Sequence, residues 1–437
     1  MNSHASDACQ PRIAAFLDEQ SAAQTAFLAE MVKVPTDNPP GDCVAHASRT
    51  RALLEGLGLT VEADPVPAAD AKACGMIAAT NLIVRQSFGT PGAGGPTIAL
   101  NAHGDVVPPG LGWTHDPYRA DIVDDPVHGP TMVGRGVAVS KSDFATYTWA
   151  LLALRKLAAE GVPLQGALEL HFTYDEEAGG AIGPQRLLET GLSKPDYAIS
   201  AGFSYAVTTA HNGCLHLEVI VRGKQAHAAM PHTGHDALEA CTSVLQALYR
   251  FRTELAQRRS KVPGIDCATL NIGLIEGGIN TNVVPDEVRL RIDRRMIPEE
   301  AGSDAQGELE AVVRAAVANL PGIRIETRRI MLAEPLTELP GAEHLAHALI
   351  RHAERVFGTA VAETGVPLYT DARHYCKAGV PTVLYGAGPR TLLEARGHAA
   401  DECLRLSDLR RATEVVTCTL IDLLTTGYTP PPQGIKK

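Results

Sequence analysis

The chain has 437 residues, 45% hydrophobic and 20% charged, with a formal net charge of -11 at pH 7. This length favours two domains, and the balance is that of a globular protein, which excludes wholesale disorder. An acidic chain without clustered lysine and arginine repels phosphate groups, so we expect neither nucleic acid nor a membrane as partner. No apolar segment reaches the ~18 residues of a membrane span.

The cysteines and the first residues indicate the compartment. Nine cysteines are spread singly, without a C-x-x-C pair, which is typical of reduced thiols that serve as small buried hydrophobes. The opening MNSHASDACQPRI lacks a basic segment followed by an apolar one, which argues against a secretory signal. We therefore expect a cytoplasmic protein.

The first predicted elements are two helices and two short strands. Apolar residues at helical spacing predict a helix over 13–34 and a second over 44–57, with a proline-rich loop between them. Strands are predicted at 60–63 and 80–85.

Two apolar strands then run into polar clusters. The strand at 97–101 (TIALN) leads into AHGDVVPP, and the strand at 168–174 (LELHFTY) leads into DEE, with a strong helix at 146–157 between them. Strands that alternate with helices predict an α/β fold with a mostly parallel sheet. Ligands bind at the carboxyl edge of such sheets, and both clusters fall there.

The pattern changes near residue 211, where strands begin to alternate apolar and polar residues as half-exposed antiparallel strands do. The expected order is strand–helix–strand–strand–helix–strand, at 215–222, 237–255, 268–275, 288–292, 305–320 and 323–329. The chain then returns to a helix, a strand and a final helix, at 343–357, 382–384 and 407–425. The simplest architecture is an α/β domain from 1–210 and 331–437, with an α+β domain inserted at 211–330.

Three groups of residues are candidates for chemistry. His103 and Asp105 share one face at a strand end, where the carboxylate would fix the imidazole tautomer of a metal ligand. By itself, this pair is more typical of a hydrogen-bonded structural histidine. His398, in RGHAADE, would by itself be a surface histidine.

The third group is the acidic run Asp175, Glu176 and Glu177. Three like charges after a buried strand destabilise the fold unless a cation or a raised pKa compensates. Adjacent glutamates point opposite ways, so one can bind metal while the other handles protons. The alternative is a solvated acidic turn.

Taken in order, the motifs resemble the M20 family of metallohydrolases, which includes aminoacylases, acetylornithine and succinyl-diaminopimelate deacylases and glutamate-releasing carboxypeptidases. The matching motifs are NAHGDVVP, GRGVAVSK, TYDEEAGG, GKQAHAAMP, GGINTNVVPD, IDRRMIP, TDAR and GHAADE. The resemblance implies a catalytic α/β domain with an inserted lid or dimerisation domain, and thus a homodimer.

The resemblance also assigns roles in the α/β domain. His103 would be a metal ligand, with Asp105 as its orienting carboxylate. Glu176 would be the general base that takes a proton from metal-bound water. Glu177 and His398 would be ligands of one metal.

In the lid domain, the resemblance places His227 and Asn282 at the oxyanion of the tetrahedral intermediate. In dimeric members, the histidine often comes from the partner subunit. Arg295 resembles the arginine that holds a substrate carboxylate, which suits its bidentate geometry. The alternative for Arg295 is an ion pair with Asp293.

Two carboxylates expected from the family are missing. Val139, in GRGVAVSK, stands where most members have an aspartate that bridges two metals, and Gly202 stands at an acidic ligand position. Neither side chain can bind a cation. We therefore expect one divalent ion, held by Glu177, His398 and a third ligand.

The third ligand is left open between His103 and Asp143, and the metal among zinc, manganese and cobalt. The sequence thus predicts a metal-dependent hydrolase of a C–N bond in a small, carboxylate-bearing molecule. Three alternatives stay open: a single-metal aminohydrolase of an aromatic amine, a two-metal N-acyl amino acid deacylase or dipeptidase, and a non-catalytic small-ligand-binding relative.

Overall fold

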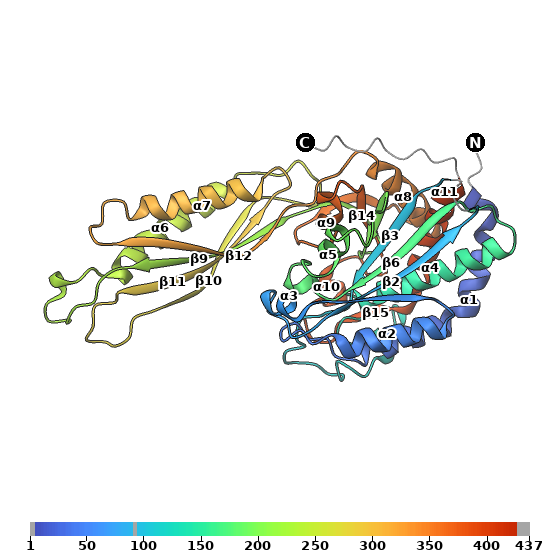
Figure 1. Cartoon of the computed structure of the whole chain (residues 1–437), viewed down its shortest axis with the longest axis horizontal. Helices are drawn as coiled ribbons and strands as arrows, with labels where there is room; N and C mark the ends of the chain where they lie inside the picture. Colours follow the sequence, from blue (N-terminus) through green and yellow to red (C-terminus); the bar gives the residue numbers. More distant parts are fainter. Residues whose placement is uncertain (1–4, 91–93, 426–437) are drawn as a thin grey trace. The chain divides into compact units, whose positions relative to one another are not determined.

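The computed structural model describes residues 5–90 and 94–425, and its internal contacts divide the chain into two units (Figure 1). The first unit comprises Met1–Thr209, Glu338–Glu363 and Thr370–Lys437, and the second comprises Ala210–Thr337 and Thr364–Tyr369. The inserted unit thus ends at Thr337 rather than at 330, and it includes a further short segment.

The first unit is built on an eight-stranded sheet of order β1-β2-β6-β3-β7-β14-β8-β13, whose last two strands connect to the second unit. The strands β6, β3, β7 and β14 at its centre are parallel, whereas β1, β2 and β8 pair antiparallel. The α/β prediction is confirmed, although the sheet is parallel only at its centre. Its strands are β1 (Val61–Pro65), β2 (Thr80–Phe88), β3 (Thr97–His103), β6 (Gly166–Thr173), β7 (Tyr197–Ser200), β8 (Ala206–His211), β13 (Ala362–Val366) and β14 (Thr382–Leu384).

Helices cover this sheet, and three long ones, α1, α4 and α11, pack against one another. Helix α4 is buried from Lys141 through Ala150 because its sequence, FATYTWALLALRKLA, is apolar around most of its circumference. The helices are α1 (Ala5–Val32), α2 (Val44–Gly56), α3 (Ala68–Ala73), α4 (Lys141–Ala159), α5 (Pro184–Glu189), α8 (Ala342–Phe357), α9 (Ala372–Lys377), α10 (Leu392–Ala395) and α11 (Leu406–Thr425).

The first unit also has a three-stranded sheet that the sequence did not predict. Its order is β15-β5-β4, formed by Cys403–Arg405, Gly129–Val133 and Asp121–Asp125. It joins the segment before α4 to the segment before α11, so it fixes two loops that border the candidate site.

The second unit is a four-stranded antiparallel sheet of order β10-β11-β9-β12, with α6 and α7 side by side on one face (Figure 1). Alternate residues of β9, such as Leu215, Leu217 and Val219, are buried in the core beneath the helices. The predicted element order is confirmed: β9 (Gly213–Arg222), α6 (Ala237–Leu255), β10 (Thr269–Gly277), β11 (Glu287–Met296), α7 (Gly302–Ala316) and β12 (Arg324–Ala333). Among the described residues, no helix is long and apolar enough to cross a membrane.

Candidate functional site

The two polar clusters predicted from the sequence meet at the carboxyl edge of the central sheet. His103 is the last residue of β3 and pairs in register with Thr173, the last residue of β6. The 3-10 turn Glu176–Ala178 follows directly. Parallel pairing of two strands that end at the same level brings residues about 70 positions apart in the chain together.

Asp105 joins these clusters. Its buried carboxylate accepts hydrogen bonds from the backbone N–H of Glu176 (3.2 Å) and of Glu177 (3.1 Å), and from the side chain of Asn38 (3.0 Å). It lies 3.4 Å from Nδ1 of His103. One carboxylate therefore orients both the histidine and the turn that carries the two glutamates.

The ring of His103 has one nitrogen engaged and one left for a ligand. Nδ1 lies 3.0 Å from the backbone oxygen of Asp105, so Nε2 is the atom available to a metal ion. Burial opposes a charged ring, but the surrounding carboxylates, Asp105 foremost, outweigh it and hold the pKa of His103 well above its usual value.

Glu177 and His398 form a pair with the spacing of two metal ligands. Oε1 of Glu177 lies 3.3 Å from Nε2 of His398, and two donors on one tetrahedral zinc ion lie about 3.4 Å apart. The hydrogen bond to Glu177 raises the pKa of His398. The histidine has a φ of 61°, so the backbone of its loop is held in a strained conformation that presents the ring.

Two carboxyl groups just before Glu177 in the chain have raised pKa values. Burial raises the pKa of Glu176 to about 7, with the charge of Glu177 adding to the rise and that of His103 opposing it. Burial, with the charge of Asp105, raises the pKa of Asp175 to about 7 as well. A divalent cation would relieve this excess of negative charge, so Glu177 and His398 fit two ligands of a metal ion. The donor atoms of His103, Glu177 and His398 do not all lie within 4.8 Å of one another, so the structure does not bring His103 to the same spacing.

Contacts that the sequence did not reveal hold the glutamate turn. Arg373 and His374 both contact the backbone oxygen of Gly179, His374 at 3.0 Å. Gly180 has a φ of 67°, and a Cβ there would lie 2.4 Å from Oδ1 of Asp371. Only glycine fits that turn. The TDAR motif was the one signal that pointed to these residues.

The loop that carries Val139 is anchored by Glu402. Its buried carboxylate accepts hydrogen bonds from the backbone N–H of Gly136 (3.0 Å), Ala138 (2.9 Å) and Val139 (3.0 Å), and it pairs with Arg135. The backbone is therefore fixed around position 139, while its side chain offers no donor.

Asp143 forms hydrogen bonds with the backbone, including that of Gly202, and not with Glu177 or His398. The carboxylate of Asp143 is buried and accepts from the backbone N–H of Ala387 (2.6 Å) and Gly202 (3.3 Å). A Cβ at Gly202 would lie 2.8 Å from the backbone nitrogen of Tyr385, so the family's acidic side chain has no room here. The carboxylate of Asp143 thus anchors two loops by their backbone.

We predict that Val139→Asp increases the metal content, because the fixed loop would present a bridging carboxylate beside His103 and Glu177. Elemental mass spectrometry after saturation with metal should give more than one ion per chain for the variant. Val139→Asn, of the same size but uncharged, is the matched control and should leave the ratio unchanged. An equal ratio in all three proteins would contradict the prediction.

In the second unit, His227 and Asn282 lie on two adjacent exposed loops. The backbone N–H of Ala228 donates to the oxygen of Asn282 (3.0 Å). Nδ1 of His227 accepts from the N–H of Ala229 (3.1 Å), so the proton of a neutral ring lies on the exposed Nε2, as an oxyanion donor requires.

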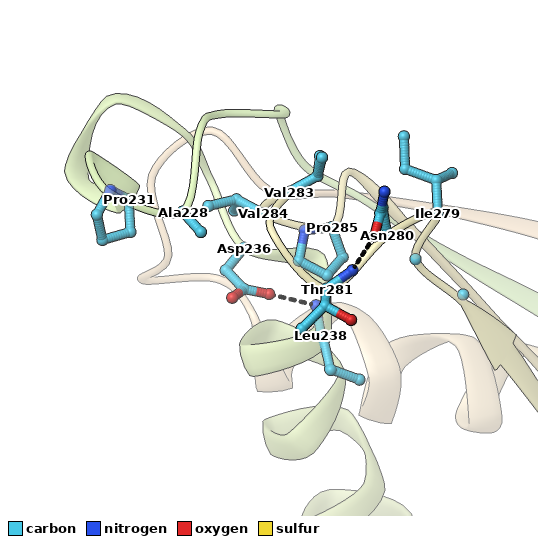
Figure 2. A pocket seen from close by; sticks show the side chains of 12 residues that line it. Ala228, Pro231, Asp236, Leu238, Ile279, Asn280, Thr281, Val283, Val284 and Pro285 are labelled. Atoms are coloured by element: carbon cyan, nitrogen blue, oxygen red, sulfur yellow. Dashed lines mark hydrogen bonds between the residues drawn. The ribbon is translucent and has the colours of Figure 1, made fainter.

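A hollow of about 640 Å³ opens between the same two loops (Figure 2). Its wall combines polar and apolar groups, and Asp236 there caps helix α6 by accepting from the N–H of Leu238 (2.8 Å). This cap fixes the start of α6, so the loop that carries His227 and leads into α6 has a fixed end.

The ion pair left open for Arg295 is present. Its Nε and Nη2 donate to the two oxygens of Asp293, at 2.9 and 3.0 Å, and its guanidinium lies 5.8 Å from the centre of the Tyr369 ring. His216 Nε2 lies 3.1 Å from the same carboxylate. The hydrogen bond to Asp293 raises the pKa of His216 to about 9.

An α/β sheet that presents a Glu–His pair, a buried carboxylic acid and an orienting aspartate at its carboxyl edge defines the class of metal-dependent hydrolases. The chain matches the model of peptidase family M20/M25/M40 over residues 99–422, and it belongs to that family. It is accordingly a metal-dependent amidohydrolase.

Curated relatives and solved structures agree with this assignment. The chain is 27% identical over 342 residues to a succinyl-diaminopimelate desuccinylase of Rhizorhabdus wittichii, covering 76% of this chain and 83% of the relative. It is 29% identical over 365 residues to an acetylornithine deacetylase of Salmonella arizonae, covering 83% and 86%. The fold matches the dipeptidase Dug1p of Saccharomyces cerevisiae (TM-score 0.74, 15% identity, 96% and 99% covered) and human carnosine dipeptidase 1 (0.69, 16%, 95% and 99%).

Proposed function

We propose that this protein hydrolyses the amide bond of a small, carboxylate-bearing substrate, such as an N-acyl amino acid or a dipeptide. The observation that carries the proposal is the Glu177–His398 pair at 3.3 Å beside the partly buried Glu176, whose pKa is raised to about 7. The relatives' names, a desuccinylase and a deacetylase of amino acid derivatives, support this substrate class.

Each residue of the first unit has a proposed task. A single zinc or manganese ion on Glu177 and His398, with His103 swinging in as third ligand when the metal binds, would polarise the carbonyl and acidify a water molecule. Glu176 accepts the proton of the attacking water and returns it to the leaving nitrogen. Asp105 fixes the backbone of the base and the ring of His103, so neither has to reorganise during the reaction.

The second unit supplies the proposed substrate contacts. Nε2–H of His227 and the side-chain amide of Asn282 would donate to the developing oxyanion. Arg295 uses Nε and Nη2 for Asp293, which leaves the N–H groups of Nη1 for the substrate carboxylate. These three assignments rest on the resemblance and on the donors that each side chain keeps.

A second candidate function is the hydrolysis of an aromatic amine. It is favoured by the missing carboxylates: Val139 offers no donor, and packing around Gly202 excludes one. One ion in a site without these two carboxylates would suit a leaving group other than an amide.

A substrate panel with the metal-loaded enzyme tests both candidates. We expect release of the free acyl acid from N-acyl amino acids, and little release from their methyl esters, because Arg295 then has no carboxylate to bind. Release of ammonia from aryl amines alone would establish the second candidate. No turnover of either class after loading with zinc or manganese would overturn the proposal.

The pH dependence of the reaction follows from Glu176. Only its carboxylate form accepts a proton, and its pKa is raised to about 7 in the metal-free protein. A bound cation lowers that pKa, so we expect kcat/KM to be constant above pH 7 and to fall tenfold per pH unit below an apparent pKa of 7 or less. A rate that increases towards acid pH would contradict Glu176 as base.

We also propose a cytoplasmic homodimer formed through the second unit. Strand β10 is an edge of its sheet, and Leu274 and Ile275 on it are 57% and 53% exposed. Unpaired edge strands with apolar side chains pair with other chains. Light scattering should give a dimer, and Ile275→Asp should give a monomer; a wild-type monomer would contradict the proposal. Cytoplasmic placement is supported by the nine cysteines, which are spread singly along the chain without a C-x-x-C pair.

A further inference from the structure

One face of the second unit's sheet carries a cluster of four side chains, of which the proposed function uses only Arg295. Cys214 and His216 are two apart on β9, and Asp293 and Arg295 are two apart on β11. The register pairs Cys214 with Arg295 and His216 with Asp293, so all four side chains share one face. Their neighbours Leu215 and Ile292 point to the opposite face, into the core beneath α6 and α7.

Three of these side chains bring possible ligand atoms together. The donor atoms of Cys214, His216 and Asp293 all lie within 4.8 Å of one another, and no other such group of histidine, cysteine and acidic residues occurs in residues 5–90 and 94–425. The distances are 3.1 Å from His216 Nε2 to Asp293 Oδ2 and 3.9 Å from Cys214 Sγ to Asp293 Oδ1. Donors on one zinc ion lie about 3.4–3.6 Å apart, between these two values.

We propose that Cys214, His216 and Asp293 form a binding site for a transition-metal ion of the zinc type, with three protein ligands and a fourth position for water. A thiolate and an imidazole select zinc, cobalt or copper, whereas magnesium and calcium require oxygen donors. This site is separate from the proposed catalytic ion, whose ligands lie in the first unit, and it does not rest on the proposed function.

Arg295 is compatible with a cation at this cluster. Its two hydrogen bonds to Asp293 use one lone pair on each oxygen, and each oxygen keeps a second lone pair. Carboxylate ligands of metals are commonly held by such an outer hydrogen-bond donor. The dipositive ion would also replace two protons, one from the Cys214 thiol and one from the charged His216 ring, so the net charge of the cluster stays the same.

The ion can reach the cluster from one side. The side chain of Cys214 is buried, whereas those of His216 and Asp293 are 38% and 28% exposed. The two exposed ligands would capture the ion from solvent, and the buried thiolate would then complete the three protein ligands. Water can take the fourth position on the open side.

Cobalt distinguishes this site from the proposed catalytic one. A thiolate bound to Co²⁺ absorbs in the near ultraviolet by charge transfer, and the donors at Glu177, His398 and His103 contain no sulfur. The band therefore reports on cysteine ligation, whether or not the catalytic position is filled and whether or not the enzyme is active.

The experiment loads the full-length protein with Co²⁺ at mildly alkaline pH and records the near-ultraviolet spectrum. We expect the charge-transfer band in the wild type and its loss in Cys214→Ser. Cys241→Ser is the matched control, because Cys241 is also buried in the second unit and its pKa is raised by burial alone; it should keep the band. His216→Gln, at a partly exposed position, should keep the fold and weaken the affinity for Co²⁺ roughly tenfold or more.

Two results would overturn the proposal. One is the absence of the band from the loaded wild type. The other is a band that persists in Cys214→Ser, since the thiolate would then belong to another cysteine. If Cys214→Ser fails to fold, His216→Gln decides the matter: unchanged Co²⁺ affinity in that variant overturns the proposal as well.

Discussion

Glu176→Gln is expected to lower kcat by about 10²–10⁴-fold while the protein keeps its fold and its metal. The amide has nearly the shape of the carboxylate but cannot accept a proton from water. The contacts of the turn survive the change, because Asp105 binds the backbone N–H of position 176 and not its side chain. Loss of turnover would therefore report on the proton acceptor and not on a displaced loop.

The measurement combines steady-state kinetics with the metal-to-protein ratio from elemental mass spectrometry. Glu189→Gln is the matched control, because Glu189 is an exposed glutamate on α5 of the same unit; it should leave both quantities unchanged. A Glu176→Gln enzyme that keeps more than a tenth of the wild-type kcat would remove Glu176 from its assigned role.

The strand ends that carry the site could be predicted because their signal is local. Each apolar run ends in a charged cluster, and parallel pairing then has to bring the two clusters to one edge. For the same reason α6 (Ala237–Leu255) and β14 (Thr382–Leu384) have the predicted bounds. Apolar periodicity defines an element whenever one of its faces is buried.

The contacts that hold the site could not be predicted, because they join residues far apart in the chain. Glu402 accepts from the N–H of Ala138, 264 positions away, and His374 contacts the oxygen of Gly179, 195 positions away. Glu402 follows GHAAD, and the pair Arg373-His374 follows TDA; neither has a local sequence pattern that reveals such partners. Only the tertiary structure brings each side chain to the loop that it fixes.

The two missing carboxylates illustrate both what the sequence reveals and what only the tertiary structure reveals. The motif comparison identified Val139 and Gly202 as departures, but it gave no reason to treat them differently. The structure does: the backbone at Val139 is fixed and its side chain can be exchanged, whereas a side chain at Gly202 would collide with the backbone of Tyr385. The proposed loss of the second metal site would thus rest on the packing at one position and on a single side chain at the other.

Glu177→Gln is expected to weaken metal binding roughly 100-fold or more, since removal of an outer partner of a ligand already costs 10–100-fold. Oε1 of Glu177 faces His398 at 3.3 Å, and an amide oxygen is a neutral and weaker donor for a divalent ion. After gel filtration the variant should contain little metal. A variant that keeps the wild-type ratio would show that the ion is held elsewhere.

Added metal then separates the two glutamates. If Glu177 is a ligand, a large excess of zinc or manganese should refill the weakened site of Glu177→Gln and recover part of its turnover, because Glu176 is still present as base. The same excess should leave Glu176→Gln inactive, because its site is already filled and lacks the proton acceptor. Recovery of both variants, or of neither, would mean that adjacent glutamates do not divide metal binding and proton transfer between them in this enzyme.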